Sequence, residues 1–294
     1  MQDTKYYTHK HDRPLNLELD GCPLAEWDQL YGKALFATHP KGFRVFLSPD
    51  RIAASDEYAD SDPYTVEQDI DSAFHRRRKD LTVDLVREAV SSVQRTPRLL
   101  DLGCGQGHIT EAIRQALHSA DVTGLDYSIS AIDYAHAHFP AIDFAVGDAY
   151  ESPYAQGFFD VVVCNNLWEH VPDPLRLLSR IKGTLRPGGY IVLSTPSRYR
   201  VANLVRILRG KSVMLMSPHH VTEYTVGQVV EQLAYGGFQV RRILSRPISG
   251  GSLKAEVVRR LLAMWMALVG SHHQLEATVF YLAQETTGSA EQAC

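Results

Sequence analysis

The sequence has no long hydrophobic run. None of its 294 residues lie in a stretch of about 18 consecutive apolar residues, the length that a membrane-spanning helix needs. The longest apolar candidate, 261–269, is far too short to cross a bilayer. The first residues, Met1–Tyr7, also lack the hydrophobic core of a signal peptide. We therefore expect no transmembrane helix and no secretion.

Cysteine is scarce. The four cysteines, Cys22, Cys104, Cys164 and Cys294, form no C-x-x-C pair and have no zinc-site spacing. Cys104 lies in a glycine-rich segment and Cys164 follows an apolar run, where a small side chain fits a tight space. This usage is typical of a reducing compartment, so we predict a cytoplasmic protein without a metal site.

Basic charge is not in excess. Lys and Arg number 30 against 34 Asp and Glu, giving a net charge of −4. A chain of this balance has no overall positive field for nucleic acid, and we expect no nucleic-acid partner. Apolar residues make up 45% and charged residues 22%, as in an ordinary globular protein.

What the sequence does have is regular alternation of strand and helix patterns after Arg98. Repeated strand–helix units predict an α/β fold with a mostly parallel sheet and helices on both faces. Ligands of such sheets bind at the carboxyl ends of the strands. The expected strands are 98–103, 121–126, 142–147, 159–164, 189–195, 238–245 and 277–284, and the expected helices are 107–118, 129–138, 173–185 and 225–235, the last with a Thr225–Gln228 capping box.

The rest of the chain does not follow this alternation. Five prolines interrupt residues 1–65, where only 44–47 has a strand pattern, so we predict an N-terminal extension that covers the substrate or forms an oligomer contact. A helical period runs through 66–93. Two insertions, 197–224 and 249–276, interrupt the second half, and we expect helical lids there.

The segment Asp101-Leu-Gly-Cys-Gly-Gln-Gly107 links the first expected strand to the next helix. Glycines at such a turn let a ligand approach the backbone. The spacing is G-x-G-x-G, with His108 where the dinucleotide fingerprint would need glycine. Asp101 precedes the first glycine by two residues, and a carboxylate there disfavours a diphosphate. The pattern therefore predicts a nucleoside cofactor that carries positive charge.

Further motifs follow in order at the ends of the expected strands. They are Asp126, Gly147-Asp148-Ala149, the run from Phe159-Asp160 to Glu169-His170-Val171, and Leu185-Arg-Pro-Gly-Gly189. With the Asp101–Gly107 segment, this series resembles the class I S-adenosylmethionine-dependent methyltransferases, whose first motif is D/E-x-G-x-G-x-G. The resemblance implies a Rossmann-like seven-stranded sheet with an antiparallel last strand, in a catalytic domain spanning 66–294. It also implies S-adenosylmethionine as cofactor, S-adenosylhomocysteine as product, and no metal.

Several residues are expected to contact the cofactor. An acid at the end of the second strand, Asp126, is suited to accept hydrogen bonds from ribose hydroxyls. The resemblance implies Asp148 at the adenine, Asn165 at the methionine part and a basic residue of helix 66–93, such as Arg78, at the carboxylate. The full expected set is Asp101, Gly103, Cys104, Gly105, Gly107, Asp126, Tyr127, Asp148, Ala149, Asn165 and Arg78.

The candidate catalytic residues are His170, His219, His220 and Glu223. Histidine titrates near neutral pH and suits a general base. The strand exit Ser-Thr-Pro and the element His220-x-x-x-Tyr-Thr resemble ubiquinone-pathway O-methyltransferases and natural-product relatives, so we expect O-methylation of a small molecule. A zinc site at His219-His220-x-x-Glu223 is the alternative, but the pattern lacks a further partner.

The insertion 197–224 has five basic residues and no acid before Glu223, interleaved with apolar residues. In an acidic chain this pattern predicts a lid for an anionic or amphiphilic substrate, or a peripheral membrane contact through 197–216. A solvated basic helix is the alternative. We also expect a homodimer as one possible assembly.

Other functions fit parts of the pattern. N- or C-methylation would use the same cofactor, and a non-catalytic S-adenosylmethionine sensor or scaffold would bind it without turnover. A nicotinamide oxidoreductase would need glycine in place of His108. The acceptor atom is not specified by these motifs.

Overall fold

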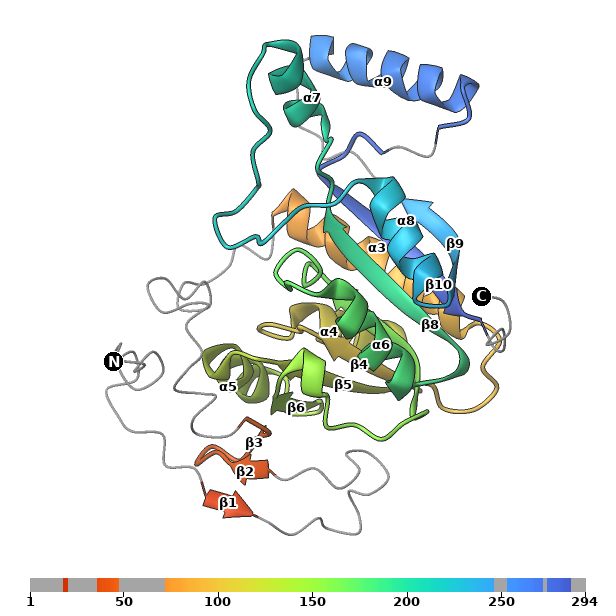
Figure 1. Ribbon diagram of the computed structural model, residues 1–294. Helices are drawn as coiled ribbons and strands as arrows, with labels where there is room; N and C mark the ends of the chain where they lie inside the picture. The colour runs from red at the N-terminus through yellow and green to blue at the C-terminus, as the bar shows by residue number, and fades with distance from the viewer. Residues whose placement is uncertain (1–17, 21–35, 48–71, 246–252, 272–273, 287–294) are drawn as a thin grey trace, which may run out of the picture.

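The computed structural model describes residues 18–20, 36–47, 72–245, 253–271 and 274–286. Within these ranges the strands form one sheet in the order β1-β2-β3-β6-β5-β4-β7-β8-β10-β9 (Figure 1). Their bounds are β1 Glu18–Asp20, β2 Phe36–Thr38, β3 Arg44–Val45, β4 Arg98–Leu102, β5 Asp121–Asp126, β6 Asp143–Val146, β7 Phe159–Asn165, β8 Leu185–Pro196, β9 Phe238–Leu244 and β10 Thr278–Glu285.

The seven strands expected from the sequence are all present, as β4 to β10. Strands β6, β5, β4, β7 and β8 are parallel neighbours. The last strand, β10, inserts antiparallel between β8 and β9. The predicted α/β fold and its antiparallel strand are therefore confirmed.

Four of the described helices begin at residues whose side chains cap them. The side chains of Ser72, Ser128 and Asp173 each accept a hydrogen bond from a backbone N–H of the first turn, and Thr225 forms the predicted capping box with Gln228. The helices are α3 Ala73–Val90, α4 His108–Ala116, α5 Ile129–His138, α6 Pro174–Thr184, α7 Val201–Leu208, α8 Val226–Tyr235 and α9 Leu253–Leu268, with a short 3-10 turn η2 Ala149–Glu151.

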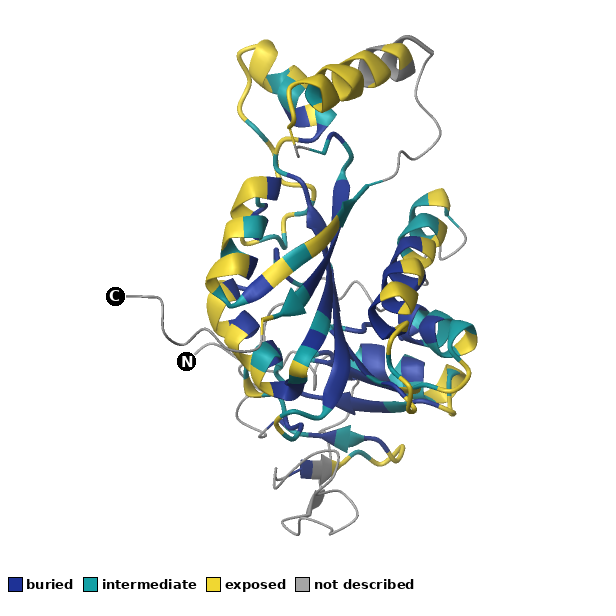
Figure 2. Cartoon of the chain, turned by 90° about the vertical axis from the view of Figure 1, so that its right-hand side faces the viewer, coloured by how far each residue is buried: buried dark blue, intermediate teal, exposed yellow. Residues whose placement is uncertain are grey.

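Helices cover both faces of the sheet (Figure 2). Apolar residues of α6 and α8 pack on one face with Trp168 and Tyr281. Residues of α3 and α4 pack on the other face, against strand residues such as Leu99 and Val161. Because neighbouring strand residues alternate between the two cores, the central strands are buried on both sides, as is usual for parallel sheets.

Part of the N-terminal segment belongs to this sheet. Strand β3 pairs parallel with β6, and β2 and β1 continue antiparallel from it. Phe43, Val45 and Leu47 are buried in one cluster with Phe144. The strand pattern at 44–47 is confirmed for its first two residues, and the sheet extends beyond the seven strands that were expected. Most of the remaining residues of 1–65, with the predicted cover or oligomer contact, lie outside the described residues.

The fifth strand was expected at 189–195, but β8 begins earlier, at Leu185. Leu185 already pairs with Phe159, and an irregularity in the β7–β8 register takes up the change of direction. Gly188 has φ +75°, and a Cβ at Gly189 would lie 3.0 Å from the Asp160 carbonyl oxygen. Glycine is therefore required inside this irregular strand, not at a separate turn.

Both insertions are helical, as predicted. Helix α7 lies in the first and α9 in the second, and both stand above the sheet in a lobe at the top of Figure 1. No helix among the described residues combines the length and apolarity required to cross a membrane.

Candidate functional site

The glycine-rich turn after β4 is held against the neighbouring strand. The amides of Gly103 and Cys104 donate to the Leu125 carbonyl oxygen at 2.8 and 3.2 Å. Gly103, Gly105 and Gly107 have φ of 75°, 54° and 78°, a region that favours glycine. The backbone can thus turn at the sheet edge without side chains that would fill the space in front of it.

Asp126, at the end of β5, supports this turn. Its Oδ2 accepts a 2.7 Å hydrogen bond from the Gly105 amide, and its Oδ1 accepts one of 2.9 Å from Ser128. Asp126 lines a small cavity of about 100 Å³ together with Tyr127 and Ala149. With Gly103, which lines the same cavity, four of the predicted cofactor residues therefore lie together.

Asp101 lies beneath the turn. Its side chain is buried and accepts a 2.7 Å hydrogen bond from the Thr110 hydroxyl. Burial raises its pKa to about 6, and the nearby Asp126 adds to this against the opposing effects of Thr110 and Arg78. Asp101 lines neither this small cavity nor the larger one that adjoins it. The structure therefore places it as a support of the turn.

A larger cavity of about 470 Å³ adjoins the first, since Gly103, Asn166 and His170 line both. It is lined by five of the predicted cofactor residues, Arg78, Gly103, Cys104, Gly105 and Asn165, and also by His75, Lys79, Gln106 and His108. Burial, followed by the neighbouring His138, lowers the pKa of His108. The wall of the cavity on α3, formed by His75, Arg78 and Lys79, is thus basic.

Asn165 ends β7 inside the larger cavity. Its amide nitrogen donates to the Thr82 hydroxyl at 2.9 Å. Its Oδ1 is buried and has no hydrogen-bond partner among the described residues. A buried acceptor without a partner is costly, so this atom is suited to a donor supplied by a ligand.

The next residue, Asn166, was not predicted. It has φ +51°, and its side chain bonds to α3, to β8 and to Glu169 in the same exit from β7. Its Oδ1 accepts from Arg78 at 3.4 Å and from Ser194 at 3.2 Å, and its amide nitrogen donates to Glu169 at 3.0 Å. The sequence signal was its place directly after a buried strand, where asparagine tolerates a left-handed backbone.

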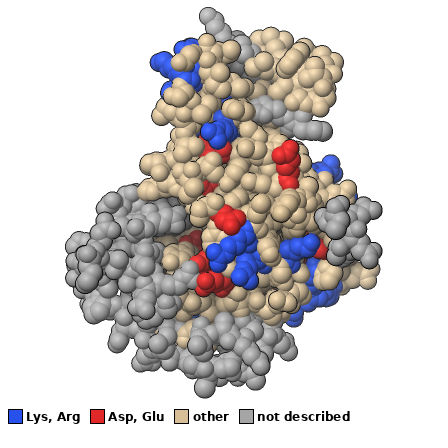
Figure 3. Space-filling view, in the orientation of Figure 1, with Lys and Arg blue, Asp and Glu red and all other residues tan. Residues whose placement is uncertain are grey.

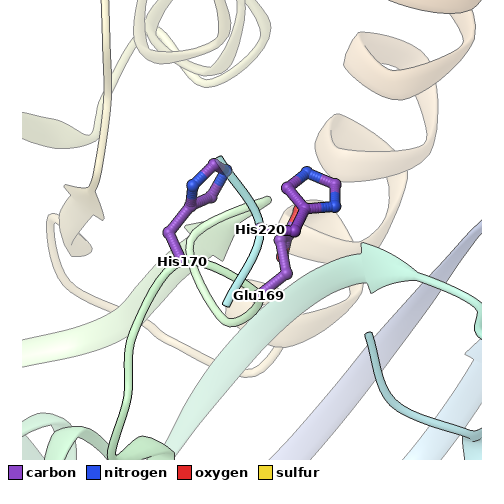
Figure 4. A group of neighbouring side chains, drawn as sticks. All are labelled: Glu169, His170 and His220. Carbon is purple, nitrogen blue, oxygen red and sulfur yellow. The ribbon is translucent and has the colours of Figure 1, made fainter. Parts of the chain in front are cut away.

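Three histidines line the other side of the larger cavity. His170, at the exit of β7, lies beside His220 from the first insertion, with ring centroids 4.9 Å apart (Figure 4). His170 Nδ1 donates to the His219 carbonyl oxygen at 3.1 Å, which leaves Nε2 as an acceptor. Burial and the neighbouring His220 lower the pKa of His170 to about 4, so this ring is neutral at pH 7.

Glu223 does not line either cavity, but it holds His220. Its buried carboxylate accepts a 2.9 Å hydrogen bond from His220 Nδ1 and further bonds from Arg200 and the Met216 amide. Burial alone would raise the pKa of Glu223, yet these three hydrogen bonds outweigh it and lower the pKa. The carboxylate thus stays charged and orients the imidazole.

Asp148 also lies outside both cavities. Its Oδ1 accepts a 2.8 Å hydrogen bond from Tyr150, which caps η2. Its expected contact with adenine stays a prediction.

A different trio from the predicted zinc set comes together. Ligating atoms of Glu169, His170 and His220 lie within 4.8 Å of one another. Both oxygens of the buried Glu169 already accept hydrogen bonds, from Asn166 at 3.0 Å and Thr195 at 3.0 Å. Burial raises the pKa of Glu169, with those bonds opposing it. Glu169 therefore serves as an internal support for the cavity wall, and the expectation of no metal stays a prediction.

Comparison with known proteins adds to this geometry. A family model described as "Methyltransferase domain" matches residues 74–243. The Ubiquinone biosynthesis O-methyltransferase of Coxiella burnetii is 35% identical over 130 residues, covering 43% of this chain and 55% of the relative. The protein of that name from Bordetella avium is 30% identical over 151 residues, covering 49% and 61%. The chain therefore spans little more than half the length of these curated relatives.

Solved structures share the fold. The CurJ carbon methyltransferase has a TM-score of 0.53 at 18% identity, covering 74% of this chain and 56% of its own. The [4+2]-cyclase SpnF has a TM-score of 0.52 at 20% identity, covering 76% and 86%. At such identities the likeness concerns the fold alone. The family model covers more than half of the chain and includes the glycine-rich turn, so this protein belongs to the methyltransferase domain family, among the class I S-adenosylmethionine-dependent methyltransferases.

Proposed function

We propose that the protein transfers a methyl group from S-adenosylmethionine to an oxygen atom of a small molecule. The observation that carries this proposal is the pair of adjoining cavities at the strand ends. One side presents the glycine turn, Asp126 and Asn165 Oδ1, which has no partner in the part of the chain that the structure describes. The other side presents histidines. A cofactor site and an acceptor site thus share one cleft.

The residues of the cleft fit this cofactor. Asp126 would accept hydrogen bonds from the ribose hydroxyls, with Tyr127 and Ala149 beside the base in the small cavity. Asn165 Oδ1 would accept a hydrogen bond from the ammonium group, and Arg78 would pair with the carboxylate. When bound, S-adenosylmethionine supplies a methyl group on a positively charged sulfur.

His220 is the better candidate for general base. Glu223 holds its Nδ1, so Nε2 is the atom that would take a proton from the acceptor hydroxyl. His170, with a pKa of about 4, is too weak a base to be useful near pH 7 and is suited to orienting the acceptor. His219 holds His170 through its carbonyl oxygen. The residues otherwise act by holding the reactants in line and excluding water.

The names of the curated relatives support oxygen as the acceptor atom. The basic residues of the first insertion give only weak support for an anionic acceptor, because they lie away from the cleft. Only Ser217, His219 and His220 of this insertion line the cleft, whereas Arg206, Arg209 and Lys211 do not. Acceptor charge would therefore be met by α3, through residues such as His75 and Lys79.

Binding measurements test the cofactor. We expect calorimetry to show binding of S-adenosylmethionine and S-adenosylhomocysteine but not NAD. Asn165→Ala should weaken binding about tenfold or more, since the ammonium loses a charge-assisted hydrogen bond. Thr82→Val is the matched control, because it removes the hydroxyl that Asn165 Nδ2 contacts but keeps Asn165 Oδ1. Equal binding by Asn165→Ala and wild type would contradict the assignment.

A substrate screen tests turnover and the base. Phenols, amines and carbon acids are incubated with the cofactor, and mass spectrometry looks for a product heavier by one CH₂. His220→Asn should lower kcat on a phenol by about 10²-fold or more while leaving cofactor affinity unchanged. Replacing the exposed His118 by Asn is the control. Cofactor binding without any methylated product would favour the sensor alternative, and products from amines alone would favour N-methylation.

A further inference from the structure

The two insertions form a distal lobe, defined here as residues 201–216 and 253–271. Helices α7 and α9 stand side by side in this lobe, away from the sheet, in both Figure 1 and Figure 2. The insertions also meet at its base, where the Val201 amide donates to the Leu275 carbonyl oxygen at 3.1 Å and Ser197 to Ala277 at 2.8 Å. Two segments far apart in the sequence thus build one surface.

The described side chains of α9 include several large apolar residues that are exposed. Trp265 is 59% exposed, Leu268 79% and Leu261 55%. Of the residues 260–269, only Met266 is even half-buried. So many large apolar side chains exposed on one short segment mark a surface that normally contacts protein or lipid. The described residues do not provide that cover (Figure 2).

The first insertion adds to the same surface. Leu208 of α7 is 86% exposed, and Met214, Leu215 and Met216 on the returning segment are exposed as well. These residues are held in place from below. The Asn203 side chain forms two hydrogen bonds with the Met214 backbone, of 3.0 and 3.1 Å, and Arg200 donates to the Met214 carbonyl oxygen at 2.6 Å. The apolar side chains are therefore presented by an anchored stem.

The charge of the lobe is mostly positive. Arg206, Arg209 and Lys211 border the apolar side chains of α7, and Arg260 lies on α9. The sequence 201–216 contains no acid, and 253–271 contains only Glu256. In Figure 3 the described part of the lobe is tan and blue. The whole chain, by contrast, has a net charge of −4.

We propose that the distal lobe docks on the surface of an anionic lipid bilayer, with the apolar residues of α7 and α9 in the headgroup boundary and the cations on lipid phosphates. Basic helices with exposed leucine and tryptophan lie in such an interface. The positive sign of the lobe is complementary to anionic lipid, whereas a second copy of the lobe would bring like charges together. The sequence predicted membrane contact through 197–216, and the structure adds α9 as its larger apolar part. This docking does not depend on the reaction in the cleft.

Vesicle flotation of the full chain tests the proposal. We expect binding to phosphatidylcholine vesicles that contain phosphatidylglycerol, and much weaker binding to phosphatidylcholine alone. High salt should weaken binding, because exposed charges are screened. Brominated lipid should quench tryptophan fluorescence through Trp265, a signal that Trp265→Phe removes while binding persists.

Matched variants separate the apolar and charged contributions. Leu268→Ser should lower vesicle affinity about tenfold, by removing one large apolar side chain from the interface. Tyr235→Ser on α8, 83% exposed but outside the lobe, should leave affinity unchanged. Replacing Arg209 and Lys211 by Gln should cost roughly fivefold per charge on anionic vesicles only. Circular dichroism checks that each variant is folded.

Two results would overturn the proposal. One is the absence of flotation with either vesicle at low salt. The other is a concentration-dependent dimer, seen by light scattering, that the Leu268→Ser substitution dissociates, combined with vesicle binding by Leu268→Ser that equals that of the control Tyr235→Ser. The second outcome would assign the lobe to a contact between copies of the chain.

Discussion

At the scale of the residue, Asp101 gives the fold a specific dependence on pH. Its carboxyl group has an ordinary pKa of 3.8, and burial raises the pKa to about 6 in the folded chain. Between these values the unfolded chain releases the proton while the folded chain keeps it. Ionisation therefore favours unfolding, and this group lowers the free energy of unfolding as pH rises from about 4 to 6.

We predict that Asp101→Asn removes this contribution. Relative to wild type, the variant should gain up to about 3 kcal/mol of unfolding free energy between pH 4 and pH 6, and no more above that range. Urea unfolding at several pH values measures it. Thr110→Val is the companion variant. Loss of the Thr110 hydrogen bond should raise the pKa of Asp101 further, so that the free energy of unfolding continues to fall above pH 6. Parallel pH profiles of wild type and Asp101→Asn would refute the argument.

The residues whose positions follow from the local strand and turn could be predicted from the sequence. The turn glycines and Asp126 follow from a strand that ends in a G-x-G-x-G segment, because the backbone geometry there is local. Asn166 and Glu169 were not predicted, since their partners Arg78 and Thr195 come from α3 and β8. Glu223 was predicted as a catalytic residue, but only the folded chain shows that it contacts Arg200 and His220 at the same time.

At the scale of the element, the start of α4 depends on Gly107. This residue has φ +78°, and a Cβ would lie 2.7 Å from Phe144 Cζ. Gly107→Ala therefore combines backbone strain with a clash in the core, and should cost more than about 2 kcal/mol of unfolding free energy. Gly157→Ala is the control, since it has φ +63° but no heavy atom within 4 Å of the added Cβ.

Comparing the two variants isolates the packing contribution. Gly157→Ala should lose only the cost of its backbone conformation, of order 1 kcal/mol. Thermal or urea unfolding gives both values. Equal losses in the two variants would mean that Phe144 moves aside without cost, contrary to the close packing of its cluster.

Most elements were predictable because their signals are local. The strands β4 to β10 are short apolar runs, and the caps of α6 and α8 are encoded at Asp173 and Thr225. The start of β8 was misplaced because Pro187 and two glycines resemble a turn, whereas Leu185 already pairs with Phe159 of β7. Pairing between strands is a tertiary contact that a local pattern does not contain.

At the scale of the whole molecule, the sequence did not predict how far the sheet extends. Strand β3 has only two residues, and prolines surround it, so its signal is weak. Its position is determined by β6, about a hundred residues away, and by burial of Phe43 and Val45 against Phe144. The meeting of the two insertions at Val201 and Leu275 is also a long-range contact.

The segment 36–47 should therefore contribute to the stability of the domain. Phe43 is 2% exposed, its ring stacks on His39 with centroids 4.2 Å apart, and it packs in the same cluster as Ile132 and Phe144. Phe43→Ala should lower the free energy of unfolding by about 3–5 kcal/mol, as for other large buried side chains. Thr38→Ala, an exposed change on β2, should shift it by less than about 0.5 kcal/mol.

A single urea transition that moves to lower denaturant for Phe43→Ala would show that this segment unfolds with the rest of the domain. If wild type instead shows two transitions and Phe43→Ala moves only the first, the segment is a separate unit attached to the sheet edge.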